Sequence, residues 1–124
     1  MKVVLFILFS GLVFSQCKKD AVKDEISPSV VIRTPADGAT FTAGQDITVT
    51  ATVTENVALE EVHFHVTNKS NNEEIVHEHY HPGDKNYEFT GHFTIQSGIT
   101  YHVEVEAEDK TGNAAEDEID VTGE

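Results

Sequence analysis

One run of residues near the C-terminus constrains the fold of this chain more than any other. From Tyr101 to Asp109, apolar residues alternate with ionisable residues, so one face of the segment is apolar and the other is polar. A period of two residues is the pattern of a strand with one buried face. The residues that follow, up to Asn113, favour a tight turn. We therefore expect the chain to reverse there and return as a partner strand.

The same alternation recurs upstream and downstream of this segment. We expect seven short strands, around residues 29–33, 47–54, 61–66, 75–81, 87–95, 101–109 and 115–121. The pattern leaves open which face of the 75–81 segment is buried. Asp117 falls among the inward residues of the last strand, which predicts a bulge or a frayed start there. With turn signals between the strands and no helical period, the sequence predicts a single all-β domain, an antiparallel β-sandwich.

The N-terminus has the pattern of an export signal. Lys2 is followed by an apolar run that ends at Phe14, too short and too close to the start for a transmembrane helix. Residues 1–16 are therefore predicted to be a signal peptide. The run leads to Cys17, the only cysteine of the chain, so the domain is expected to fold without a disulfide.

The sequence around Cys17 resembles the lipobox of bacterial lipoproteins. This resemblance implies cleavage before Cys17, acylation of its thiol and stable attachment to a membrane through the acyl chains. The alternative is an ordinary cleaved signal peptide. If Cys17 is acylated, residues 17–27 are the acylated cysteine and a flexible tether, and residues 28–124 are the folded domain. The charged start of the tether resembles that of lipoproteins from Bacteroidetes, which implies a place at the outer membrane, periplasmic or surface-exposed.

The excess of negative charge on the chain limits the kinds of partner that it can bind. Aspartate and glutamate number 22 against 8 lysines and arginines, and removal of residues 1–16 would take away one more positive charge, Lys2. Such a surface repels nucleic acid and anionic membranes and attracts cations.

Four spaced motifs resemble those of bacterial immunoglobulin-like domains. They lie at Pro28 to Gly38, at Gly44 to Ala51, at Glu55 to Phe64 and at Gly98 to Asn113. The resemblance implies an immunoglobulin-like β-sandwich in which Phe64 takes the third-strand position of the antibody tryptophan. It also implies a tyrosine corner, in which the hydroxyl of Tyr101 bonds the backbone just upstream. The resemblance is specific for the fold and does not name a function.

All seven histidines lie between His63 and His102. In an immunoglobulin-like sandwich the third and sixth strands are neighbours, so His63 and His65 should stand near His102 and Glu104. If the fourth strand joins the same sheet with its odd residues outward, His77, His79 and His81 extend this patch. His92 is expected on the opposite sheet.

Histidines two residues apart on a strand point the same way, which suits a shared metal ion. The candidate ligands for zinc or copper are His63, His65, His77, His79 and His102. The alternatives are that these side chains are solvated positions on an acidic sheet, or that they sense pH by mutual repulsion when protonated. A calcium site formed by Glu55, Asp109 and Asp37 is a further possibility, because immunoglobulin-like and cadherin-like modules sometimes bind calcium.

The sequence contains no arrangement typical of an enzyme. It lacks a nucleophile with an adjacent base, a glycine-rich phosphate loop and a paired-acid motif. We therefore expect a non-enzymatic, lipid-anchored module of the cell envelope for binding or structural assembly, with an unknown protein or glycan partner. The alternatives are a histidine-rich metal-binding lipoprotein and an accessory subunit that joins a larger surface complex through a sheet edge.

Overall fold

The computed structural model describes residues 23–124. The predicted signal peptide, residues 1–16, and the predicted acylation site, Cys17, lie outside the described residues. Within the described part, no helix has the length and hydropathy that crossing a membrane would require.

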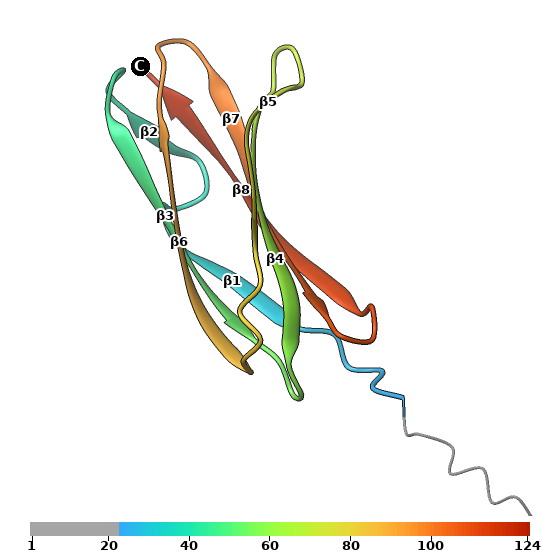
Figure 1. The fold of residues 1–124 in the computed structure, drawn as a ribbon. Coiled ribbons are helices and arrows are strands. Elements are labelled where there is room, and N and C mark those ends of the chain that lie inside the picture. The colour runs from blue at the N-terminus through green and yellow to red at the C-terminus, as the bar shows by residue number, and fades with distance from the viewer. Residues whose placement is uncertain (1–22) are drawn as a thin grey trace, which may run out of the picture.

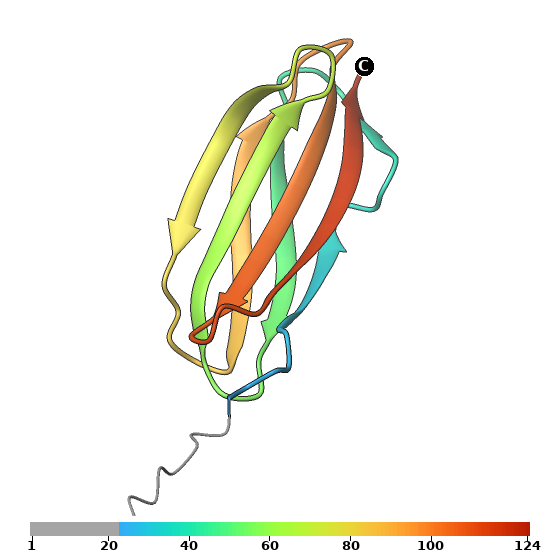
Figure 2. The same ribbon diagram turned by 90° about the vertical axis from the view of Figure 1, so that its right-hand side faces the viewer.

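The chain forms two β-sheets packed face to face (Figure 1 and Figure 2). The strands are β1 (Ser29–Thr34), β2 (Ala39–Phe41), β3 (Asp46–Thr54), β4 (Leu59–Asn68), β5 (Glu73–Tyr80), β6 (Asn86–Thr94), β7 (Thr100–Asp109) and β8 (Ala114–Gly123). One sheet has the order β1-β3-β6 and the other the order β2-β8-β7-β4-β5. The predicted all-β sandwich is therefore confirmed.

The short strand β2 was not predicted, and it makes eight strands where the sequence suggested seven. After β1 the chain turns at Gly38, which has a positive φ of 80° and whose N–H donates to the carbonyl oxygen of Asp120 at 2.8 Å. The chain thereby crosses to the other sheet, where β2 pairs with β8 in parallel. The sandwich is thus antiparallel except for this pair. Three residues are too few for an alternating pattern to show.

The core is built from the inward residues of both sheets, as the alternation predicted. On β7, and on β4 from Val62 onward, every second residue is buried. The ring of Phe64 lies 5.0 Å from that of Phe89, measured between centroids, and Gly91 leaves room for both rings. The hydroxyl of buried Tyr101 accepts a hydrogen bond from the N–H of Gln96 at 3.2 Å, so the expected tyrosine corner is present.

Asp117 does not cause the bulge that its position in the sequence suggested. It stays in register on β8, opposite Val105 of β7. Its carboxylate instead accepts a hydrogen bond from the backbone N–H of Ile32 in β1 at 2.8 Å. The inward acidic residue therefore ties the edge strand of one sheet to a strand of the other, which explains its place among apolar neighbours.

The last residues of the predicted tether contact the folded domain. The side chain of Asp24 accepts a hydrogen bond from Asn56, and its carbonyl oxygen accepts others from Thr111 and Asn113. The N-terminal segment thus joins the sandwich beside the β3–β4 and β7–β8 turns. The C-terminus lies at the opposite end (Figure 1).

Candidate functional site

The pairing of β4 with β5 brings four histidines together on the outer face of the larger sheet. His63 lies directly opposite His79, and His65 directly opposite His77. Their neighbours Val62, Phe64 and Val66 are fully buried, so the inward residues of β4 fix the histidines to the outer face. The odd residues of β5 do point outward, which the sequence pattern had left open.

A bulge in β5 adds an acidic residue to this face. The register shifts so that Val66 pairs with Val76 and Thr67 with Glu74, which leaves Ile75 as an extra residue on β5. Glu74 therefore shares a face with His77 although their sequence positions have opposite parity. Sequence reasoning missed Glu74 because the shift of register leaves no trace in the alternation.

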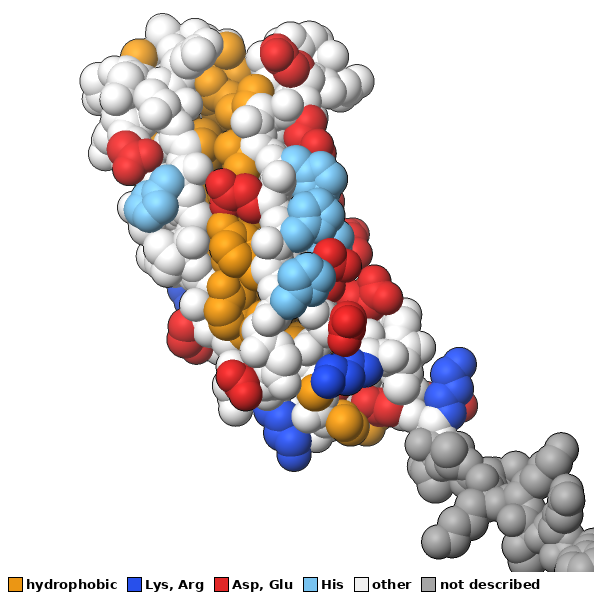
Figure 3. Space-filling view, viewed as in Figure 1, with side chains coloured by type: hydrophobic (Ala, Val, Ile, Leu, Met, Phe, Trp, Pro, Cys, Tyr) orange, Lys and Arg blue, Asp and Glu red, His pale blue; other side chains and the backbone are white. Residues whose placement is uncertain are grey.

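The four imidazole rings form a compact group, here called the histidine face and consisting of His63, His65, His77 and His79. Ring centroids are 4.3 Å apart for the His63–His79 pair and 4.2 Å for the His65–His77 pair. Along β5 the rings of His77 and His79 are 4.4 Å apart, and along β4 the two rings are 5.9 Å apart and nearly parallel. Figure 3 shows histidine side chains gathered on the flank formed by β4 and β5, beside a band of hydrophobic side chains.

One carboxylate lies at each end of the histidine face. Glu74 contacts Nδ1 of His65 and Nδ1 of His77, each at 2.9 Å. Glu61 lies 3.1 Å from Nδ1 of His79 and 3.1 Å from Nε2 of His63. Three of the four rings therefore use Nδ1 for the carboxylate and leave Nε2 for a ligand.

These contacts lower the pKa of both carboxyl groups. The hydrogen bond with His79, aided by the nearby His63, lowers the pKa of Glu61, although partial desolvation opposes the effect. The hydrogen bond with His65, with help from His77, lowers the pKa of Glu74 in the same way. Glu61 could have been found from the sequence, because it has the same parity as His63 on β4.

The arrangement has the chemistry of a transition-metal site. Ligand atoms of His63, His65 and His77 lie within 4.8 Å of one another, and so do those of Glu61, His63 and His79. Neutral imidazole suits zinc, copper and nickel. Metal-bound histidines commonly donate their second ring N–H to a carboxylate, which orients the ring. Glu61 and Glu74 are placed for that role.

Glu104 on β7 borders the histidine face, as the sequence suggested, since it lies directly opposite His65. Partial burial raises the pKa of Glu104, and the negative charge of Glu116 raises it further, while His65 opposes both effects. Glu104 of β7 thus adds negative potential beside the histidine face, and this potential favours a bound cation.

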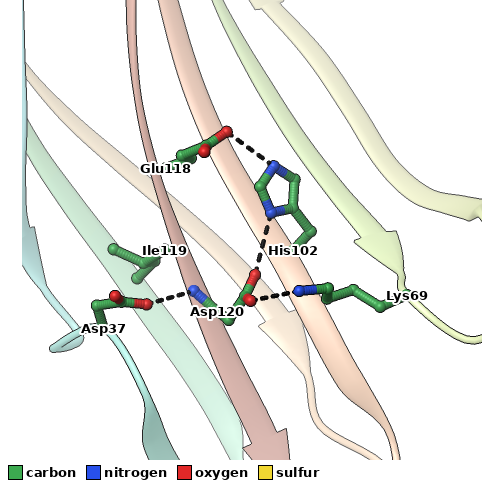
Figure 4. Close-up of a pocket in the computed structure, with 6 residues that line it drawn as sticks. All are labelled: Asp37, Lys69, His102, Glu118, Ile119 and Asp120. Carbon is green, nitrogen blue, oxygen red and sulfur yellow. Dashed lines mark hydrogen bonds and ion pairs between the residues drawn. The ribbon is translucent and has the colours of Figure 1, made fainter.

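His102 belongs to a separate group. It pairs with Thr67, two residues beyond His65 on β4, and its ring turns toward β8 (Figure 4). There Nε2 lies 3.2 Å from Glu118 and Nδ1 lies 3.0 Å from Asp120, which also holds Lys69 (Figure 4). The expectation that His102 stands beside His63 and His65 is therefore not met, because its carboxylate partners on β8 draw it away.

The two remaining histidines lie outside the histidine face. His81 follows β5, and its Nε2 is 3.9 Å from Glu61. His92 lies on β6 in the opposite sheet, as expected, where its Nδ1 is 3.4 Å from Asp46. Neither histidine belongs to a group of three or more metal-ligating side chains whose ligand atoms the described residues bring within 4.8 Å of one another.

The acidic residues suggested for calcium are only partly brought together. Glu55 and Asp109 are close, but the third member of their group is Asp24 rather than Asp37. Asp37 lies elsewhere, beside Asp120, and accepts a hydrogen bond from its backbone N–H at 2.8 Å. Burial opposes ionisation of Asp109, but hydrogen bonds from Asn113 and Thr111 outweigh it and lower its pKa to about 2.

Comparison with known proteins places this geometry among immunoglobulin-like folds. The profile of a family described as bacterial Ig domain matches residues 28–105. Fibronectin(III)-like modules of CbhA from Clostridium thermocellum are similar, with 26% identity and a TM-score of 0.57 over 77% of this chain and 94% of theirs. Spo0M, a sporulation control protein from Bacillus subtilis, has 12% identity and a TM-score of 0.46 over 79% of this chain and 49% of its own. No curated protein matches the chain.

Proposed function

This chain belongs to the bacterial Ig domain family, and from that premise we propose that it is a non-enzymatic binding module of the cell envelope whose ligand is a zinc or copper ion. Bacterial Ig domains are typically extracellular or surface-associated, and immunoglobulin-like and fibronectin-like folds are typically non-catalytic. The family therefore supports a binding or structural role. The histidine face supports the choice of a metal ion as the ligand.

The observation that carries the proposal is the pairing of two histidines with two others across β4 and β5. Imidazoles on adjacent strands are held within 4.8 Å by the backbone ladder, so little chain entropy is lost when an ion joins them. His63, His65 and His77 would supply three nitrogen ligands. His79, or a water molecule, would complete a four-coordinate site.

The surrounding charge supports the same ligand. Glu61 and Glu74 hold the rings from either end, and Glu104 adds a third carboxylate along the β7 side. A cation that approaches this face meets negative potential before it reaches the nitrogen ligands. Two of the four imidazoles, on β5, remain exposed at the sheet edge, so an ion would reach them without rearrangement of the fold.

The place in the cell that we propose is the outer membrane, through acyl chains on Cys17. This part of the proposal is supported by the apolar run and the single cysteine of the sequence. It is tested by feeding a labelled fatty acid to cells that express the full chain. Label is expected on the native protein and not on a Cys17→Ser variant, which should leave the membrane fraction. Equal labelling of both proteins would contradict the anchor.

The metal proposal is tested by calorimetric titration of a soluble form, residues 18–124, with zinc and with copper. This form keeps the complete core, because every core residue lies between Val30 and Val121. We expect micromolar or tighter binding. The His63→Ala, His65→Ala double variant should lose at least about tenfold in affinity, since two of three ligands are removed.

The matched control is a His81→Ala, His92→Ala double variant, which also removes two imidazoles but leaves the histidine face intact. It should bind as the native form does. No binding by the native form, or equal loss in both double variants, would overturn the metal proposal. A protein or glycan ligand would then be the remaining candidate for this binding module.

A further inference from the structure

Three carboxylates meet where the N-terminal segment joins the sandwich. Asp24 precedes β1, Glu55 follows β3, and Asp109 ends β7. One ligand oxygen from each lies within 4.8 Å of those of the other two. Figure 2 shows the N-terminal segment passing the turns at this end of the molecule. The group shares no residue with the histidine face.

Two of the three carboxylates are almost completely buried. Glu55 is 8% exposed and Asp109 is 2% exposed. Within residues 23–124, no lysine, arginine or histidine forms an ion pair with any of the three. Buried carboxylates without a positive partner are costly, and their mutual repulsion adds to the cost. A cation bound among the three carboxylates would offset this cost.

One oxygen of Glu55 has no partner within the described part of the chain. Its Oε2 accepts hydrogen bonds from the N–H groups of Val57 and Ala58, at 2.9 and 3.2 Å. Its Oε1 is buried and accepts none from residues 23–124. A buried polar atom that is left unpaired costs free energy comparable to a lost hydrogen bond. Oε1 is thus the oxygen that remains to bind a ligand.

Asp109 and Asp24 are held in place by the turns around them. Oδ1 of Asp109 accepts three hydrogen bonds from Thr111 and Asn113, whereas Oδ2 accepts one, from the side chain of Asn113. Oδ1 of Asp24 accepts from the side chain of Asn56 at 3.1 Å. Each carboxylate therefore keeps a fixed orientation and still has an oxygen available.

We infer that Asp24, Glu55 and Asp109 bind a calcium ion at the junction of the N-terminal segment and the domain. All three ligands are carboxylates, which suit a hard cation and not the softer metals favoured by imidazole. Calcium accepts irregular geometry and completes its shell with water or carbonyl oxygens, whereas magnesium demands near-ideal octahedral geometry. Because Asp24 lies in the N-terminal segment, the ion links that segment to two turns of the sandwich.

The test compares melting temperatures of the soluble form, residues 18–124, in calcium, in magnesium and in a chelator. Calcium is expected to raise the melting temperature by about 10 °C or more at about 100 times the dissociation constant. Glu55→Gln should melt no lower than the native form in chelator, because it removes a repelling buried charge, and should lose the rise in calcium. Asp24→Asn should weaken calcium binding about tenfold or more with little change in chelator.

Glu25→Gln is the matched control, since it neutralises an exposed neighbour of Asp24 on the same segment. It should keep the full response to calcium. The His63→Ala, His65→Ala double variant should also keep it, which separates this site from the histidine face. A native melting temperature that is the same in millimolar calcium and in chelator would overturn the inference. So would an undiminished response of Glu55→Gln, or an equal response to magnesium.

Discussion

The carboxylate of Asp117 on β8 accepts a hydrogen bond from the backbone N–H of Ile32 on β1, across 85 residues of sequence. The two strands belong to different sheets, so this bond closes one edge of the sandwich. It also uses a backbone donor of an edge strand, which would otherwise invite pairing with another chain.

Replacement of this carboxylate should therefore destabilise the fold. Asp117→Ala is expected to lower the free energy of unfolding by about 1–2 kcal/mol, because a partly buried N–H loses a charged acceptor. Urea denaturation would measure the change. Glu116→Ala is the control: Glu116 is exposed and lies near the carboxylates of Glu104 and Glu106, so its removal should cost nothing. Equal losses in both variants would contradict a specific role for Asp117.

Gly91 on β6 is required by the aromatic core beneath the histidine face. A Cβ atom at this position would lie 2.6 Å from Cε1 of Phe64 and 2.6 Å from Cζ of Phe89. Gly91→Ala should therefore destabilise by about 1–3 kcal/mol through overpacking, seen as a lower melting temperature. Combination with Phe64→Leu, which makes room, should cost less than the sum of the two single changes. Strict additivity would show that no clash occurs.

The sequence predicted those features that depend on alternation within one strand. The outward direction of His63 and His65 follows from the buried Val62 and Phe64 beside them. The tyrosine corner followed from the placement of Tyr101 in an immunoglobulin-like chain. Both features are local, or fixed by the family pattern.

The adjacency of β4 and β7 followed from the family pattern, but features that depend on bulges and on side-chain contacts between strands could not be predicted. The bulge at Ile75 brings Glu74 to the histidine face against its sequence parity, and the contacts of His102 with Glu118 and Asp120 on β8 keep its ring away from that face. Asp24 lies in a polar segment without periodicity, so only the fold reveals its approach to Glu55. Distances between strands depend on register, which both paired strands and the turns between them set together, so the alternation within one strand does not reveal it.

The Asp120–Lys69 pair makes a pH-dependent contribution to stability. The hydrogen bond from Lys69 lowers the pKa of Asp120, with His102 adding to the effect and partial burial opposing it. A carboxylate whose pKa is lower in the folded state stabilises the fold above its unfolded pKa, near 3.8, and this contribution is lost as pH falls below that value. Both side chains are partly exposed to solvent, which screens the pair, so the contribution is modest, about 0.2–1 kcal/mol.

Asp120→Asn should therefore melt slightly below the native form at pH 7, and the difference should shrink as the pH falls below that unfolded value. Melting curves across this range would show it. Asp84→Asn changes an exposed carboxylate in the β5–β6 turn that forms no ion pair within the described residues, and should follow the native curve. A difference that stays constant at low pH would rule out titration of Asp120 as its cause.

Tyr80, at the end of β5, should ionise later than an ordinary tyrosine. Its hydroxyl donates to the carboxylate of Glu78, and this bond, together with partial burial and the charge of Glu78, raises the pKa of Tyr80 to about 12. Subtraction of the ultraviolet titration of Tyr80→Phe from that of the native form isolates this one of three tyrosines. In Glu78→Gln, with the acceptor charge removed, the midpoint of the Tyr80 titration should move down toward the ordinary value.

Because a raised pKa stabilises the fold only while the hydroxyl stays protonated, the native form should also lose stability above pH 10 faster than Tyr80→Phe. An unchanged midpoint in Glu78→Gln would show that burial alone holds the hydroxyl protonated.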